Sequence, residues 1–163
     1  MKIESIPMLV LSILASASPA FGTDWQHYVN ARFGTSADVP SSFLRAPAPD
    51  NGDGQQFRSS DGGSVTVFGG MNPMAGSLAD YRRFLKDVLE DDGWTLSYAP
   101  EGRNWFVLSG KRDGEILYHR VEHRTACGAD LLHHIEFRYP GNRATAWSAV
   151  VKRGAATLDG PCE

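Results

Sequence analysis

The sequence predicts an α+β domain, with an antiparallel sheet of about six to eight strands and two main helices packed on it. Residues 105–139 read as three consecutive strands, because runs of β-branched and aromatic residues are interrupted only by the turn dipeptides at 113–114 and 127–128. Residues 78–89 and 147–158 instead repeat apolar side chains at helical spacing. Both kinds of element occur in one chain, which predicts helices covering a sheet.

The side chains of the last two strands predict how these strands pair. With residues 127–129 as the loop, apolar residues collect on one face of the hairpin and opposite charges meet on the other. This register places Val121 opposite Ile135, His119 opposite Phe137, Leu117 opposite Tyr139, Arg120 opposite Glu136 and Glu122 opposite His134. A shift by one residue mixes the two faces, so the pattern favours this register.

Turn residues divide the rest of the chain into shorter strands. The segments predicted as strands are 24–30, 35–39, 55–59, 64–68 and 94–99. Residues 41–54 are rich in Pro, Ser, Asp, Asn and Gly, which is typical of a loop.

Residues 50–54 of this loop read Asp-Asn-Gly-Asp-Gly and allow two interpretations. A calcium loop of the helix-loop-helix type needs oxygen ligands at alternate positions and a Glu at the twelfth. Here the acidic residues are three apart and no such Glu follows, whereas Asn-Gly and Asp-Gly are strong turn signals. The sequence therefore favours a plain turn.

Both predicted helices carry one apolar stripe. In the first, Ser77 is the expected N-cap, Gly93 ends the helix, and the stripe is Leu78, Tyr81, Phe84, Leu85, Val88 and Leu89. In the second, the stripe is Trp147, Val150, Val151, Gly154 and Leu158. We expect the first stripe to face the core and not a partner, and Gly154 to let the second helix lie close to the sheet.

The first 22 residues have the features of a secretory signal peptide. One Lys precedes an apolar run from Ile6 to Ala15, and small residues follow it. This run is about half of the roughly 20 residues that span a bilayer, so stable membrane insertion of the mature chain is not expected. We expect residues 23–163 to form a single soluble domain in the periplasm or outside the cell. The net charge of −3 argues against nucleic acid as a partner.

The two cysteines, Cys127 and Cys162, both belong to the exported part of the chain. In an oxidising compartment they are expected to form a disulfide with each other. The closed loop of about 35 residues would stabilise the fold by roughly 3 to 4 kcal/mol.

The histidines of the long hairpin are the candidates for chemistry. In the predicted register His119, His123 and His133 share a face, which makes them weak candidates for a zinc site. Such a site needs three or four ligands, and no Asp or Glu shares that face nearby, so half-buried structural histidines are the favoured interpretation. Ser109-Gly110 lacks the Gly-x-Ser-x-Gly context of a hydrolase nucleophile. We therefore predict no catalytic residue, cofactor or metal.

Several turn and core motifs support a family resemblance. They are Y-x-N-x-R-F-G (28–34), V-P (39–40), N-G-D-G-x-x-F (51–57), S-x-D-G (59–62), D-G-W (92–94), W-F-V-L-S-G (105–110) and F-x-Y-P (137–140). With these motifs the chain resembles a family of uncharacterised periplasmic proteins of alphaproteobacteria, which is similar in strand order to the fold shared by Mog1 and the photosystem protein PsbP. The resemblance implies a Mog1/PsbP-like sandwich and a role in binding or scaffolding.

Two functional hypotheses follow. The first is a soluble, non-catalytic periplasmic domain that binds a protein or a cell-envelope component, because the sequence shows no convergent set of titratable groups. The alternative is a small periplasmic hydrolase or metal-dependent enzyme that uses the hairpin histidines.

Overall fold

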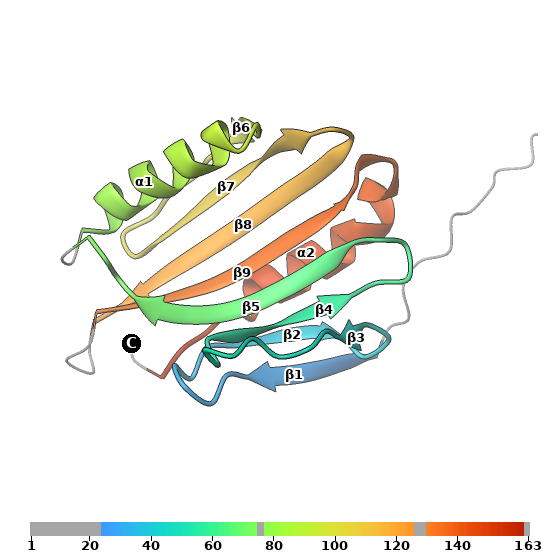
Figure 1. Ribbon diagram of the computed structural model, residues 1–163, viewed down its shortest axis with the longest axis horizontal. Coiled ribbons are helices and arrows are strands. Elements are labelled where there is room, and N and C mark those ends of the chain that lie inside the picture. Colours follow the sequence, from blue (N-terminus) through green and yellow to red (C-terminus); the bar gives the residue numbers. More distant parts are fainter. Residues whose placement is uncertain (1–23, 75–76, 126–129, 162–163) are drawn as a thin grey trace, which may run out of the picture.

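Residues 24–74, 77–125 and 130–161, which a computed structural model of the protein describes, form two antiparallel sheets and two main helices (Figure 1). The larger sheet has the strand order β3-β4-β5-β9-β8-β7-β6, and β1 pairs with β2 in the smaller one. The strands are β1 (Trp25–Val29), β2 (Ser36–Pro40), β3 (Leu44–Arg45), β4 (Gly54–Arg58), β5 (Ser64–Met71), β6 (Thr95–Tyr98), β7 (Trp105–Arg112), β8 (Glu115–Arg124) and β9 (Leu131–Pro140). The helices are α1 (Leu78–Asp91), the short 3₁₀ helix η1 (Gly141–Arg143) and α2 (Ala144–Ala156). The predicted fold class is confirmed.

The two helices cover opposite faces of the larger sheet. Along β9, Ile135 and Phe137 belong to the same apolar cluster as α2, whereas Leu132 packs with α1. Odd and even positions of a strand point to opposite sides, so α1 defines a front face and α2 a back face. In Figure 1, α2 runs behind β5 and β9, while α1 lies along the β6–β7 side.

The back core forms where α2 and the β1–β2 pair pack on the sheet. Trp147 is fully buried, stacks on Tyr139 with ring centroids 4.9 Å apart, and donates a hydrogen bond from Nε1 to Asp61 (2.9 Å). A Cβ on Gly154 would lie 2.8 Å from the Phe137 ring and 3.0 Å from Ile135. The sequence prediction for Gly154 is confirmed, because only a glycine lets α2 approach this closely.

Helix α1 begins at the predicted cap, where the Ser77 hydroxyl accepts a hydrogen bond from the Asp80 amide (3.1 Å). Four residues of its stripe, Leu78, Tyr81, Leu85 and Leu89, pack against the front core of Trp94, Phe106, Leu108, Leu117, Val121 and Leu132. Phe84 and Val88 are each 45% exposed. Helix α1 therefore buries most of the predicted stripe and leaves one apolar flank in solvent.

The predicted pairing of β8 with β9 is wrong by one residue. Val121 lies opposite His134, His119 opposite Glu136, and Leu117 opposite Arg138. Both faces of this hairpin are covered, and β9 begins with five consecutive buried residues, so alternation gives no single solvent face to fix the register.

The predicted pairs Arg120–Glu136 and Glu122–His134 are consequently absent. Arg120 lies opposite Ile135 and donates instead to Glu122 on its own strand, at 2.8 and 3.1 Å. Glu136 points to the other face and accepts from Arg138 (2.6 Å). Neighbours two apart on one strand share a face, and here they take the place of the predicted cross-strand pairs.

The other sequence predictions concern the shorter strands, membrane insertion, and segments that the structure does not describe. The predicted strands before and after α1 are confirmed, and the structure adds the two-residue strand β3 inside the predicted loop 41–54. No helix of the described residues is long and apolar enough to cross a membrane. The signal peptide, the loop 127–129 and both cysteines, Cys127 and Cys162, lie outside the described residues.

Candidate functional site

Three rows of neighbouring side chains cross the front face from β4 to β7. They are Gly54-Phe68-His134-Val121-Phe106, then Gln56-Thr66-Glu136-His119-Leu108, then Arg58-Ser64-Arg138-Leu117-Gly110. The β7–β8 end of the rows is mostly apolar and contributes to the front core under α1. The opposite end carries mostly polar, partly exposed side chains, which we call the open half: Gln56, Arg58, Ser64, Thr66, Phe68, Glu136 and Arg138.

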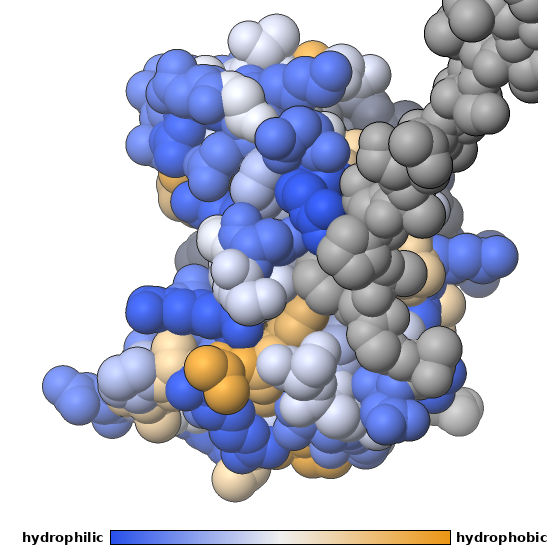
Figure 2. All heavy atoms as spheres, turned by 90° about the vertical axis from the view of Figure 1, so that its right-hand side faces the viewer, coloured by the Kyte–Doolittle hydropathy of each residue, from blue (hydrophilic) through white to orange (hydrophobic). Residues whose placement is uncertain are grey.

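The contacts of α1 show which of its flanks borders the open half. Arg82 pairs with Glu101 (3.2 Å) and donates to the carbonyl of Ala99 (2.8 Å), so its flank faces the β6–β7 connection. Phe84 lies about 200° around the helix from Arg82 and therefore on the opposite flank. Tyr81 packs edge-on against His134 of β9, with ring centroids 5.7 Å apart. In Figure 2, where the front face lies at the left, the outline of the molecule is hollowed at mid-height.

A cavity of about 550 Å³ lies between the open half and the segment 46–53. Its lining combines apolar and polar residues: Ala46, Pro47, Pro49, Asn51, Asp53, Gly54, Gln55, Gln56, Arg58, Thr66 and Phe68. This volume is within the range of small-molecule sites, about 300 to 1,000 Å³, and such sites also combine apolar walls with a few polar groups.

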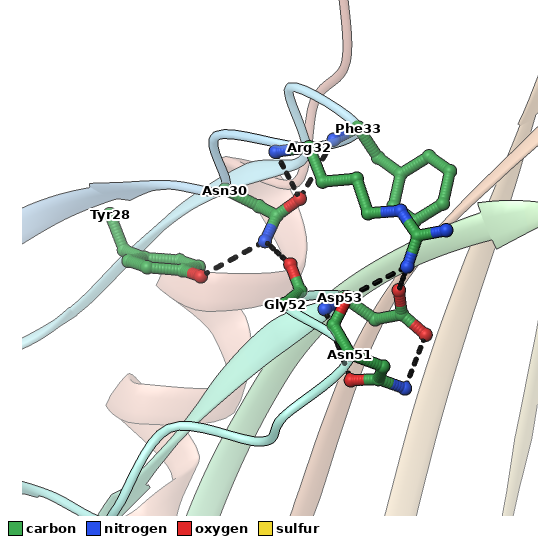
Figure 3. Close-up of polar contacts among 7 residues, drawn as sticks. All are labelled: Tyr28, Asn30, Arg32, Phe33, Asn51, Gly52 and Asp53. Carbon is green, nitrogen blue, oxygen red and sulfur yellow. Dashed lines mark hydrogen bonds and ion pairs between the residues drawn. The ribbon is translucent and has the colours of Figure 1, made fainter.

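Asn30 attaches the segment 46–53 to the β1–β2 turn (Figure 3). This buried side chain donates to the carbonyl of Gly52 (2.8 Å) and to the hydroxyl of Tyr28 (3.4 Å), and its oxygen accepts from the amides of Arg32 (3.1 Å) and Phe33 (2.8 Å). The side chain of Asn30 uses its amide and its carbonyl together, so it holds both loops in one geometry.

Arg32 adds a second attachment (Figure 3). Its guanidinium donates to the Asn51 carbonyl and to the Asp53 carboxylate, each at 2.7 Å, and Asn51 donates its side-chain amide to the same carboxylate (2.7 Å). The predicted turn at 50–54 is confirmed, with Gly52 at φ +67°. The motif residues at 28–34 and 51–54 thus hold the outer wall of the cavity.

The structure separates the histidines that the sequence placed on one face. His119 and His123 point to the front face, but His133 points to the back, where its Nδ1 is 2.7 Å from the Thr35 hydroxyl. His119 is hydrogen-bonded to His134 (Nε2 to Nδ1, 3.1 Å), which the predicted register had placed on the other face. His123 contacts Asp130. Among the described residues, no three His, Cys, Asp or Glu side chains form a group that could hold a metal ion.

Burial determines the charge of His119, His133 and His134. Burial lowers the pKa of His119 and takes that of His134 well below its usual value, with the neighbouring His119 as a second cause. Burial also lowers the pKa of His133 to about 4. Phe68 stacks on the His134 ring, with centroids 4.4 Å apart and planes inclined by 9°. The His119–His134 pair is therefore uncharged, and it lies beneath Phe68 of the open half and Tyr81 of α1.

Ser109 has a structural role in β7. Its hydroxyl donates to the carbonyl of Leu117 (2.7 Å), an interaction that does not activate it for attack. A Ser nucleophile needs a hydrogen bond to a general base, and here the hydroxyl proton is given to a backbone carbonyl.

Comparison with known proteins yields matches only among solved structures: no protein-family model matches the chain, and no curated protein sequence matches it. CyanoP, the PsbP protein of Synechocystis sp. PCC 6803, superposes with a TM-score of 0.63 at 17% identity, covering 90% of this chain and 98% of CyanoP. The Ran-binding protein Mog1p of Saccharomyces cerevisiae gives 0.58 at 12% identity, covering 85% and 96%. The chain has the Mog1/PsbP-like fold. LpqN of Mycobacterium tuberculosis, which is involved in cell envelope biogenesis, shares this Mog1/PsbP-like fold, with a TM-score of 0.56, 10% identity and coverage of 85% and 91%.

Within the Mog1/PsbP-like fold, the cavity residues Gln56, Arg58, Thr66 and Phe68 were not singled out from the sequence. Their alternation with buried residues identifies one face of the hairpin 54–71, but any solvent-facing strand shows the same pattern. These residues form a site because the segment 46–53 lies over that face of the hairpin. This segment is held by the hydrogen bond from Asn30 to the carbonyl of Gly52, 22 residues further along the chain.

Proposed function

We propose that this chain is a non-catalytic binding domain of the periplasm and that the open half, with the cavity beneath the segment 46–53, is its binding site. The observation that carries the proposal is a cavity of about 550 Å³ on a sheet face that the domain's own helix leaves uncovered. Binding sites favour such concave surfaces with apolar walls and a few polar groups.

The two hydrophobic cores support a binding role because neither uses the open half. Gln56, Thr66 and Phe68 are partly exposed, and none of them belongs to either apolar cluster. These side chains are therefore available to a ligand without loss of core packing. The alternative, an enzyme that uses the hairpin histidines, has less support because His119 and His134 are buried beneath Phe68 and Tyr81.

The solved structures with this fold also support a binding role. Mog1p binds Ran, and LpqN is involved in cell envelope biogenesis. We propose a protein or a cell-envelope component as the partner of this chain as well, in keeping with the predicted signal peptide.

The proposed site is tested by placing a photo-crosslinking amino acid at Thr66, with Lys152 on the exposed side of α2 as the matched control. After irradiation in intact cells, intact-mass spectrometry should show a specific adduct at position 66 and none at position 152. Equal labelling at both positions, or no adduct at position 66, contradicts the proposed site.

We also propose that the Cys127–Cys162 disulfide forms. The side chains of Arg124 and Asp159, each three residues before one of the cysteines, are hydrogen-bonded, with the guanidinium nitrogen 3.2 Å from the carboxylate oxygen. Three residues span at most about 10 Å, so both cysteines can reach the same region. Thiol alkylation of protein from the periplasm should label neither cysteine before reduction and both after it. Two free thiols, or a dimer that separates on reduction, would contradict the pairing.

A further inference from the structure

Phe68 offers a bare aromatic face to the cavity. One face of its ring stacks on His134, the neighbour on β9. The neighbour on β4 is Gly54, where a Cβ would lie only 2.4 Å from the Cβ of Phe68. Because Gly54 has no side chain, nothing in this row covers the second face of the ring, which is directed over Gly54 toward the cavity that both residues line.

The two rows beside that of Phe68 carry polar groups that have no hydrogen-bond partner among the described residues. Arg58 is exposed, donates from Nε to the Gln56 side-chain oxygen (2.9 Å), and makes no ion pair with any carboxylate of the described residues. The other N–H groups of Arg58, the amide N–H groups of Gln56 and the hydroxyl of Thr66 are thus available to a ligand. All three side chains line the cavity.

The opposite rim supplies acceptors. The Asp53 carboxylate accepts from Arg32 and from the Asn51 side-chain amide, and each carboxylate oxygen can accept more than one hydrogen bond. The cavity therefore combines a flat apolar surface, donors and acceptors around it, and the Arg58 guanidinium, which makes no ion pair within the described part of the chain.

Resting on the proposed function, we infer that this cavity binds a saccharide that carries a carboxylate. The C–H face of a pyranose ring packs on the bare face of Phe68, because its C–H groups are attracted to the negative face of an aromatic ring. Ring hydroxyls both donate and accept, which matches Gln56, Thr66 and Asp53. The carboxylate pairs with Arg58 through charge-assisted hydrogen bonds.

A peptide fits this site less well, because the adjacent sheet edge is already occupied. One recurring way for an extended peptide to bind is to add a strand to a free sheet edge. Here β3 pairs with β4, the Ala46 amide donates to the carbonyl of Gln56 (2.9 Å), and the Gln55 side chain donates to the carbonyl of Ala46 (2.7 Å). The outer edge of β4 beside the cavity has no room for another strand.

The test is a ¹⁵N NMR titration of the purified protein with N-acetylmuramic acid and with N-acetylglucosamine, which share a ring and differ in the lactyl carboxylate. We expect both sugars to shift the amides of Gln56, Thr66 and Phe68, and the acidic sugar to bind more tightly. Arg58→Gln should weaken binding of the acidic sugar about tenfold or more and weaken binding of the neutral sugar much less.

Two further variants complete the design. Lys152→Gln removes an exposed charge from α2 and should leave both affinities unchanged. Phe68→Leu, which keeps an apolar side chain next to His134, should weaken both sugars. Equal affinities for the two sugars, or no effect of Arg58→Gln, would overturn the inference.

The failure of this inference and that of the proposed function are distinguishable. If a proline-rich peptide shifts the same amides and neither sugar does, the saccharide is wrong and the binding site stands. If position 66 captures nothing in cells, the site itself is wrong.

Discussion

The two faces of β4 and β5 show how one pair of strands serves stability and binding at once. On the back face, Phe57, Val65 and Val67 are at most 1% exposed beneath α2 and the β1–β2 pair. On the front face, Gln56, Thr66 and Phe68 alternate with them and stay partly exposed. The back face is closed because α2 approaches through Gly154, whereas α1 lies over the far strands and leaves the front face of β4 and β5 uncovered.

This difference predicts that changes on the two sides have different effects. Substitutions in the back core should unfold the protein without a specific effect on binding. Substitutions in the open half should alter binding with little effect on stability, because surface changes away from buried contacts usually alter the free energy of unfolding by less than about 0.5 kcal/mol.

The largest effect is expected for Trp147→Ala in the back core. The substitution removes a fully buried ring, its stacking on Tyr139 and its hydrogen bond to Asp61, so we expect a loss of about 3 to 5 kcal/mol in the free energy of unfolding. Phe84→Ala on the exposed flank of α1 is the control and should cost less than about 1 kcal/mol. Urea denaturation measures both values, and similar losses would show that the front layer is as tightly packed as the back.

Acid should weaken the contact between the back face and the β1–β2 turn. Burial, followed by the charge of Arg124, lowers the pKa of His133 from 6.5 to about 4. The unfolded chain then binds a proton that the folded chain does not, so this part of the stability is complete above pH 6.5 and is lost as the pH falls from 6.5 toward 4. The loss amounts to at most about 3 kcal/mol.

This pH effect is measured by urea denaturation at several values between pH 7 and pH 4. His133→Gln, which keeps a polar side chain next to Thr35, should show a flatter decline than the natural protein. Identical slopes for the two proteins would mean that the titration of His133 is not coupled to folding.

The sequence predicted the features that depend on local patterns and missed those that depend on contacts between distant segments. The stripe of α2, its Gly154 and the cap of α1 were predicted because helical periodicity and capping are local patterns. The register of β8 with β9 was predicted wrongly because both faces are covered and His133 and His134 are both buried, which removes the usual alternation. The cavity was not predicted, since it depends on contacts between Asn30 and Gly52 and on where α1 ends its coverage of the sheet.

A smaller effect distinguishes two glycines on the two sides. Gly154→Ala should lower the free energy of unfolding by about 1 kcal/mol, because the cost of overpacking against Phe137 and Ile135 exceeds the gain in helix propensity. Gly70→Ala in β5 meets no heavy atom within 4 Å and should be neutral or stabilise by up to about 1 kcal/mol. Thermal denaturation gives the sign of each change. A stabilising Gly154→Ala would show that α2 can move away from the sheet at no cost.

The smallest effect concerns the wall of the cavity. Arg32 and Asp53 are joined at 2.7 Å, but their side chains are 56% and 34% exposed, so a double-mutant cycle with Arg32→Ala and Asp53→Ala should give a coupling energy of about 0.2 to 1 kcal/mol. The coupling should decrease in high salt, because solvent ions screen an exposed pair. Asn30→Ala should cost more than either single variant, since it removes a buried amide and leaves the groups that it bonds in Figure 3 without their partner. A coupling above about 2 kcal/mol would instead mean that Arg32, and not Asn30, is the principal attachment of the segment 46–53.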